Sequence, residues 1–367
     1  MKKKKSLRTG FTTGTAAAAA AKGALQYLLS QKISDIIRIP FLSTGSVDIS
    51  IHSCTLENAD TAVCTVIKDA GDDPDITHKA EIGARVSLLS KQNSQEIKIT
   101  GGEGVGIVTR PGLEILPGEP AINTGPKKMI CQAIKDCFDD YNQTGSVQVE
   151  IFIPKGKTLA LKTMNARLGI LGGLSVLGTT GIVRPLSHDA YVATIDASLS
   201  VAKASGFKHI YLTTGRRSER FVQQYWKQDN LKSMTDEMII QIGDYFADSI
   251  KLAKTKEINR ITFAVFFGKA IKMAMGVACT HAAKISLSIS MLSQWTESIS
   301  NDSEFSKKIQ QSNTARQAFY SIREQYPKVI DFVGQKVIEA AHTFAGPSLK
   351  IGCIIFDYEG SIVFQKV

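Results

Sequence analysis

Two adjacent arginines stand where a predicted strand gives way to a helix, and they offer the clearest chemistry in the chain. The run Thr214, Gly215, Arg216, Arg217 and Ser218 follows an apolar segment typical of a strand. Arginine binds carboxylates through paired hydrogen bonds, and the serine would open a helix whose free N–H groups favour an anion. Glycine permits backbone angles that other residues avoid. The run is therefore a candidate anion site; the alternative is a surface turn with solvated arginines.

A second basic segment follows the almost wholly apolar run 261–267. Gly268 ends that run, and Lys269 and Lys272 share one face of the helix that follows. Parallel sheets bind ligands outside the carboxyl ends of their strands, so both basic segments are expected to face a ligand. A solvated helix start is the alternative for the lysines. Downstream, His281 is either a satisfied structural residue or a base, since histidine titrates near neutrality.

Three carboxylates in four residues follow a strand predicted to end near residue 68. Asp72, Asp73 and Asp75 could cap a helix, bind a cation or hold a catalytic base. They do not form an EF-hand loop, because no glutamate stands at the later loop position where an EF-hand requires one. A capped turn is the commoner outcome of such a cluster, and Asp72 is kept as the candidate base.

Two glycine-rich segments offer backbone that a ligand can approach closely. Residues 101–106 (GGEGVG) lead into a predicted strand rather than a helix, which disfavours a dinucleotide-binding loop. Residues 169–181 hold five glycines, and their ligand-facing candidates are Gly172, Gly173, Thr179 and Thr180. This second segment either borders a ligand cleft or permits a tight crossover between domains, and its spacing fits both.

The composition is that of a soluble globular protein. The chain has 367 residues, of which 43% are hydrophobic and 21% charged. No apolar run reaches the roughly 18 residues of a membrane span, and no secretory core follows the basic N-terminus. We therefore expect a cytoplasmic protein that binds no membrane. The six cysteines form no CxxC pair, so reduced, mostly buried thiols and no protein-bound metal are predicted.

The net charge of +10 favours a polyanionic partner. Nucleic-acid binders concentrate basic residues in stripes with interleaved aromatics, but only residues 2–5 form a basic run here, and aromatics make up 7%. We therefore predict a small multi-carboxylate ligand and no nucleic acid. The alternatives are an RNA-binding protein, with steep salt dependence, and a phosphotransferase that uses residues 101–106 as its phosphate loop.

The predicted pattern of helices and strands that must position these residues changes near residue 160. Before it the pattern is mixed, with helices predicted through the alanines 16–21 and from Pro126, and strands at 47–51, 63–67 and 147–153. Thr12 or Thr13 would cap the first helix. After it, strands at 209–213 and 261–267 alternate with helices, one of them starting at Thr235, and residues 350–364 form a hairpin. This predicts two domains: an α+β domain over 1–158 and an α/β domain with a mostly parallel sheet over 159–367.

Taken in order, these segments resemble the cobalt-precorrin-5B C1-methyltransferase (CbiD) family. The resemblance spans nearly the whole chain, and its most specific parts are the glycine blocks 101–123 and 167–185. The other matching stretches are 8–15, 69–77, 214–219, 268–281 and 356–360. Ala16 departs from the cysteine that is common in the family, so a thiol at this position is not essential here.

The resemblance implies both a fold and an activity. The first domain would be similar to domain 2 of ribosomal protein S5, and the second to precorrin-8X methylmutase. The activity would be methyl transfer from S-adenosylmethionine to carbon 1 of cobalt-precorrin-5B, giving cobalt-precorrin-6A, in the anaerobic route of cobalamin biosynthesis. The acetate and propionate groups of this corrinoid suit a basic protein with loop arginines. The resemblance is compatible with a homo-oligomer as well as with a monomer.

The resemblance also gives the singled-out residues roles. Substrate carboxylates are expected to bind a set of cations: Arg167, Arg216, Arg217, Lys269 and Lys272. The co-substrate S-adenosylmethionine is expected at small or hydroxylated loop residues: Gly172, Gly173, Thr179, Thr180, Thr214, Gly215 and Ser218. His281 or Asp72 is the candidate base if carbon 1 needs deprotonation.

Overall fold

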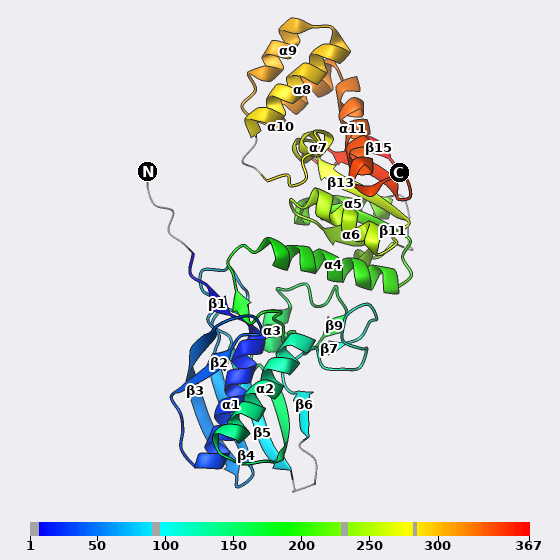
Figure 1. Ribbon diagram of the computed structural model, residues 1–367. Coiled ribbons are helices and arrows are strands. Elements are labelled where there is room, and N and C mark those ends of the chain that lie inside the picture. Colours follow the sequence, from blue (N-terminus) through cyan, green and yellow to red (C-terminus); the bar gives the residue numbers. More distant parts are fainter. Residues whose placement is uncertain (1–6, 90–95, 229–233, 282–284) are drawn as a thin grey trace, which may run out of the picture. The chain divides into compact units, whose positions relative to one another are not determined.

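The computed structural model describes residues 7–89, 96–228, 234–281 and 285–367, and the chain divides into two compact units (Figure 1). The first comprises Met1–His188 and the second Asp189–Val367. The basic run 2–5 lies outside the described residues. Each unit combines a β-sheet with helices packed on it, so the prediction of two mixed α and β domains is confirmed.

A six-stranded sheet in the order β2-β3-β4-β5-β8-β6 forms the base of the first unit. Its strands are β2 (Ile36–Pro40), β3 (Ser46–Asn58), β4 (Thr61–Ile67), β5 (Glu81–Leu89), β6 (Ile97–Gly101) and β8 (Ser146–Phe152). Neighbouring strands are antiparallel except β6 and β8, which are parallel. Shorter elements complete the unit: β1 (Gly10–Phe11), β7 (Ile107–Val108), α3 (Gly156–Ala160), β9 (Ile170–Leu171) and β10 (Ile182–Val183).

Two helices, α1 (Thr13–Ser30) and α2 (Thr124–Asp140), lie side by side on this sheet (Figure 1). The prediction that Thr12 or Thr13 caps the first helix is confirmed, because the Thr12 side chain accepts a hydrogen bond from the Thr15 N–H at 3.2 Å. The alanines 16–21 are fully buried. Their small side chains let α1 approach the sheet and α2 closely; a Cβ on Gly14 would lie only 2.6 Å from Pro126.

The first unit extends thirty residues beyond the boundary predicted at residue 158, because the second glycine block folds back onto it. A Cβ on Gly173 would lie 2.2 Å from the carbonyl oxygen of Gly104, so the two backbones are in direct contact. The Asn165 amide donates to the Gly173 carbonyl at 3.0 Å, and the Leu177 N–H donates to the Thr13 hydroxyl at 2.9 Å. Residues 159–188 therefore belong by their contacts to the first unit.

The second unit is built on a five-stranded sheet in the order β12-β11-β13-β14-β15. Its strands are β11 (His209–Thr213), β12 (Ile239–Gln241), β13 (Arg260–Phe266), β14 (Lys350–Phe356) and β15 (Ile362–Lys366). The pairs β12–β11, β11–β13 and β13–β14 are parallel, and β15 is antiparallel to β14. The predicted mostly parallel sheet and the C-terminal hairpin are both confirmed.

Helices cover both faces of this second sheet. Alternate residues of β11 point to opposite sides: Ile210 and Leu212 join the larger core, while Tyr211 packs with Phe221 and Trp226 in the smaller one. The larger core is shared with α4 (His188–Ala204), α6 (Phe246–Thr255), α7 (Phe267–Ala274), α8 (Ile285–Ser300), α9 (Ser303–Gln310), α10 (Ala315–Gln325) and α11 (Lys328–Ala345). The smaller core is closed by α5 (Arg216–Gln228).

The helix predicted to start at Thr235 is wrong. A 3₁₀ turn at Asp236–Met238 leads into β12, and α6 begins only at Phe246. The apolar residues 239, 242, 246 and 250 imitate a helical period, but Ile239 and Ile240 instead pair with β11 in the sheet. Pairing with an existing buried strand outweighs the local pattern, and Gly243, at φ +55°, turns the chain towards α6.

The prediction of reduced thiols is also wrong for one pair of cysteines. Cys54 on β3 and Cys64 on β4 form a disulfide, with Cα atoms 4.1 Å apart. They are directly opposed partners of antiparallel strands, which brings their side chains together. Cys131, Cys137, Cys279 and Cys353 are free, and burial raises the pKa of the Cys137 thiol to about 12.

Candidate functional site

A pocket of about 280 Å³ lies in the second unit, where the parallel strands β13 and β14 end. Three cations and two aromatic rings take part in its lining, which consists of Arg217, Phe266, Gly268, Lys269, Lys272, Ser288, Ile289, Thr314, Ala315 and Tyr358. Folding therefore brings together three cations from the two basic segments singled out in the sequence. Their place at the carboxyl ends of parallel strands is the expected location of a ligand site in this class of sheet.

Arg217 sits in the first turn of α5 and is held by aromatic rings. Its guanidinium lies 5.0 Å from the ring centroid of Phe266 and 5.7 Å from that of Phe221. One terminal nitrogen donates to the backbone carbonyl of Tyr358. Among the described residues Arg217 forms no ion pair with a carboxylate, so the rest of its five-donor fork is available to an anion.

Lys269 is paired with a carboxylate that the sequence did not single out. The Asp244 carboxylate accepts a hydrogen bond from the Lys269 ammonium and another from the Thr280 hydroxyl at 2.9 Å. The Thr280 N–H also donates to the Asp244 carbonyl at 2.8 Å. Burial alone would raise the pKa of Asp244, but the hydrogen bonds from Lys269 and Thr280 lower it. Asp244 follows β12, so recognising that strand would have revealed it.

Lys272 is buried, with 9% of its surface exposed, and it fixes the loop after α7. Its ammonium donates to the backbone carbonyls of Thr280 and His281, both at 3.2 Å. An ammonium has three N–H bonds, so one remains for a ligand. Burial lowers the pKa of Lys272, and the neighbouring charge of Lys269 lowers it further.

The other sequence candidates of the second unit do not line this pocket. Arg216 is exposed at the start of α5, and the helix begins there, two residues before the predicted Ser218. Ser218 is buried, and its hydroxyl donates to the Gly215 carbonyl at 2.9 Å, so it fixes the turn. Thr214 is half-buried beside it. His281 is exposed, and its carbonyl is bound by Lys272 as described above.

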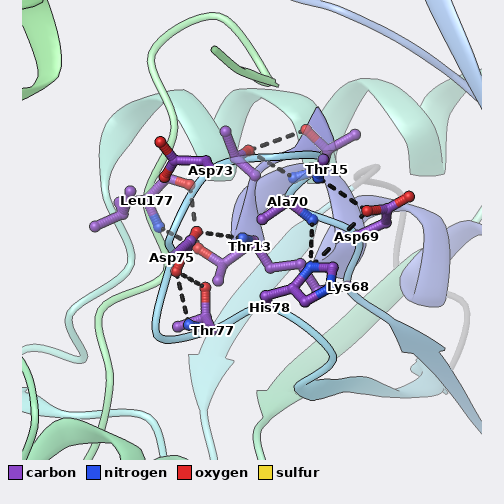
Figure 2. A network of polar contacts seen from close by, with 12 residues as sticks. Thr13, Thr15, Lys68, Asp69, Ala70, Asp73, Asp75, Thr77, His78 and Leu177 are labelled. Atoms are coloured by element: carbon purple, nitrogen blue, oxygen red, sulfur yellow. Dashed lines mark hydrogen bonds and ion pairs between the residues drawn. The ribbon is translucent and has the colours of Figure 1, made fainter. Parts of the chain in front are cut away.

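The acidic cluster of the first unit is a hydrogen-bonded turn (Figure 2). Asp75 forms an ion pair with the fully buried Lys68 at 2.5 Å and accepts from the Thr77 N–H at 2.7 Å. Asp73 accepts from the Leu186 N–H at 3.0 Å. The exposed Asp72 accepts from the Arg8 N–H at 2.7 Å. All three carboxylates therefore hold backbone or a buried cation in place.

The glycine-block candidates belong to the first unit, and they are not among the residues that line the pocket described above. Gly173 is in tight backbone packing, whereas Gly172, at φ +80°, has no atom within 4 Å of the place that a Cβ would take. Thr180 accepts a hydrogen bond from the Ile182 N–H at 3.2 Å, and Thr179 is exposed. Arg167 is half-buried in the same unit.

Two kinds of feature are absent from the described part of the chain. There, no three or more histidine, cysteine, aspartate or glutamate side chains are grouped so as to hold a metal ion. The helices among the same residues include none that is both long and apolar enough to cross a membrane.

Replacement of Asp244 by alanine is expected to destabilise the second unit by about 1–2 kcal/mol, since the Lys269 ammonium and the Thr280 hydroxyl lose their partner. The measurement is urea denaturation followed by tryptophan fluorescence, because Trp226 and Trp295 both lie in this unit. Asp244→Asn, which keeps an oxygen for Thr280, should lose less. Equal stability of all three proteins would contradict the network.

Comparison with known proteins covers both units. The CbiD family model matches residues 1–185, and the model of the CbiD C-terminal domain matches residues 279–367. The cobalt-precorrin-5B C(1)-methyltransferase of Leptospira interrogans is 39% identical over 98% of this chain and 95% of its own length. Those of Geobacter sulfurreducens and Geobacillus kaustophilus are 38% identical, covering 98% and 100% of this chain and 98% and 96% of their own. The crystal structure of the cobalamin biosynthesis protein CbiD from Archaeoglobus fulgidus is 24% identical over 71% of this chain and 78% of that one, with a TM-score of 0.38. On the full-length sequence matches, the chain belongs to the CbiD family.

Proposed function

We propose that this protein is a cytoplasmic cobalt-precorrin-5B C1-methyltransferase. It transfers a methyl group from S-adenosylmethionine to carbon 1 of the corrinoid, giving cobalt-precorrin-6A in anaerobic cobalamin biosynthesis. Relatives that carry this name match the chain from end to end. The structural observation that supports the proposal most is the convergence of Arg217, Lys269 and Lys272 on one pocket, since the substrate is a polycarboxylate.

The pocket fits a carboxylate arm of the substrate. Ligands of drug size occupy clefts of about 300–1,000 Å³, so a cavity of about 280 Å³ takes one acetate or propionate arm rather than the macrocycle. Arg217 and Lys269 would bind the arm, and Lys272 would hold the 280–281 loop beside it. The stacked rings of Phe266 and Tyr358 form an apolar wall beside these cations, and charge interactions are stronger where less water surrounds them.

The methyl donor arrives already activated as a sulfonium, so the protein's main task is to align sulfur, methyl and carbon 1. Of the loop residues expected to contact the donor, Gly172 and Gly215 have the most open backbone, with no atom within 4 Å of the place that a Cβ would take. Gly173 is packed against the backbone of Gly104, and the Ser218 hydroxyl is hydrogen-bonded in the turn at the start of α5. We therefore propose that the donor lies against Gly172, on the unit that also carries Thr179 and Thr180, or against Gly215, next to Thr214 in the chain.

His281 is the better candidate for a base, if carbon 1 needs one. Its backbone carbonyl is bound by Lys272, which lines the pocket, and its side chain is exposed. Asp72 is exposed as well, but its carboxylate already accepts a hydrogen bond from the Arg8 N–H.

For the folds, we propose that the first unit is similar to domain 2 of ribosomal protein S5 and the second to precorrin-8X methylmutase. The two helices on a largely antiparallel sheet support the first likeness.

Incubation of the purified protein with cobalt-precorrin-5B and methyl-labelled S-adenosylmethionine tests the function. We expect a product heavier by one methyl group, labelled at carbon 1, and saturable binding of S-adenosylhomocysteine in calorimetry. His281→Ala should slow turnover more than Asp72→Ala; wild-type turnover in both would remove both residues as bases. Absence of methylated product and of S-adenosylhomocysteine binding, with salt-sensitive RNA binding instead, would refute the proposal.

A further inference from the structure

A larger pocket, of about 570 Å³, lies at the other edge of the second sheet, where the parallel strands begin. His209, Arg260 and Lys350 are the first residues of β11, β13 and β14 and line this pocket. They are partners in register, so their side chains leave the same face of the sheet. Lys208 and Lys254 complete its basic lining. We call Lys208, Lys254, Arg260 and Lys350 the strand-start cluster.

The backbone fixes the spacing of these cations. The Arg260 N–H donates to the Lys208 carbonyl at 3.0 Å, and the Lys350 N–H donates to the Asn259 carbonyl at 3.1 Å. The sheet ladder thus assembles the cluster from three separate segments, the outer two of which are more than a hundred residues apart in the chain. Its members repel one another, and folding holds them together despite that repulsion.

Carboxylates do not balance the strand-start cluster. Within the ranges that the structure describes, no ion pair joins any of its four members to an acidic side chain. Glu257 is the one acidic residue of the lining in the described part of the chain, and its carboxylate lies 3.6 Å from the ammonium of Lys203, which is outside the lining. Four cations therefore face a concave space with one, already paired, counter-charge.

His209 is a half-buried member of the pocket lining. Its imidazole Nε2 is 2.8 Å from the Thr262 hydroxyl, and its ring stacks on Tyr211 with centroids 4.5 Å apart. Burial, and then the charge of Arg260, lower the pKa of His209 to about 4. The ring is therefore neutral at pH 7 and adds no charge to the pocket.

We propose that the strand-start pocket binds a compact polyanion, a small molecule with several phosphate or carboxylate groups. A volume of about 570 Å³ falls in the usual range for small-molecule sites. Among the described residues, the lining includes no phenylalanine, tyrosine or tryptophan on which a nucleobase could stack, which favours a small polyanion over single-stranded nucleic acid. The pocket lies at the amino ends of the strands, so it is separate from the pocket that we propose for a substrate carboxylate, and it does not depend on that assignment.

Calorimetric titration of the full chain with tripolyphosphate and with citrate tests this site. We expect saturable, one-to-one binding of at least one of them; the preferred probe distinguishes phosphate from carboxylate ligands. Lys254→Ala/Lys350→Ala should weaken that binding about tenfold or more, because two charge-assisted contacts are lost. Both lysines are exposed, so the variant should fold; circular dichroism checks this.

The matched control is Lys251→Ala/Lys328→Ala, which removes two exposed lysines of the same unit outside the pocket and should bind as the wild type does. A second readout is the His209 imidazole followed by NMR, whose pKa should rise when the anion binds. Equal weakening in both double variants, no saturable binding of either probe, or binding of an RNA oligonucleotide alone would overturn the proposal. None of these readouts requires methyl transfer.

Discussion

Arg217→Ala is expected to lower kcat/KM for methyl transfer to cobalt-precorrin-5B about 10- to 100-fold. The guanidinium is fixed by Phe266, Phe221 and the Tyr358 carbonyl, so little side-chain entropy is lost when it binds a carboxylate. A hydrogen bond to a charged group contributes about 1.5–3 kcal/mol, and a bidentate contact lies at the upper end. Steady-state kinetics with varied corrinoid concentration measures the loss.

The control for Arg217 is Arg220→Ala, which removes an exposed arginine from the same helix outside the pocket. It should leave kcat/KM within a factor of about two. Arg217→Lys should recover only part of the activity, because an ammonium cannot reproduce the planar fork. Affinity for S-adenosylhomocysteine should stay unchanged in Arg217→Ala if the arginine binds the corrinoid. Wild-type kinetics in that variant would show that the pocket holds no substrate carboxylate.

Asp75→Ala should cost the first unit about 3–5 kcal/mol of unfolding free energy. Lys68 is 1% exposed, and its ammonium pairs with Asp75 at 2.5 Å (Figure 2). Without the carboxylate, a buried cation is left uncompensated, and the Thr77 N–H and hydroxyl lose their acceptor. Hydrogen exchange at α1 and β4 measures the loss. The tryptophan fluorescence transition should change little, since both tryptophans lie in the second unit.

Lys68→Met is the matched control, because it removes the cation and keeps an apolar chain of similar length. It should be clearly more stable than Asp75→Ala. The pKa of Asp75 gives a further check: burial alone would raise it, but the charge of Lys68 and the hydrogen bonds lower it. The stabilisation from Asp75 is thus complete above the unfolded value of about 3.9 and is lost as pH falls through the lower folded value. The gap between wild type and Asp75→Ala should therefore close in acid; a constant gap would contradict the pair.

Regular elements with strong local signals were predictable from the sequence. The alanine-rich helix with its Thr12 cap, the strand 209–213 and the C-terminal hairpin all lie where periodicity and capping residues placed them. The buried strand β13 was predictable because a parallel strand covered on both faces reads as one apolar run. The rule for the carboxyl ends of such strands then pointed to Arg217, Lys269 and Lys272 without knowledge of the fold.

Features made by long-range contact were not predictable in this way. Ile239 and Ile240 fit a helix locally, and their pairing with β11 decides otherwise; that same error hid Asp244. Asp75 looked like a possible metal or catalytic carboxylate until its partner proved to be a buried lysine.

By itself, the sequence determined the class of each strong element, the basic segments after the strands and, through its motifs, the family. Only the tertiary structure decided that residues 159–188 pack on the first unit, that Cys54 faces Cys64, and that four cations meet where the strands begin. The physical reason is the range of the forces involved. Periodicity and capping act within a few residues, whereas strand register and backbone packing join residues whose separation along the chain carries no local signal.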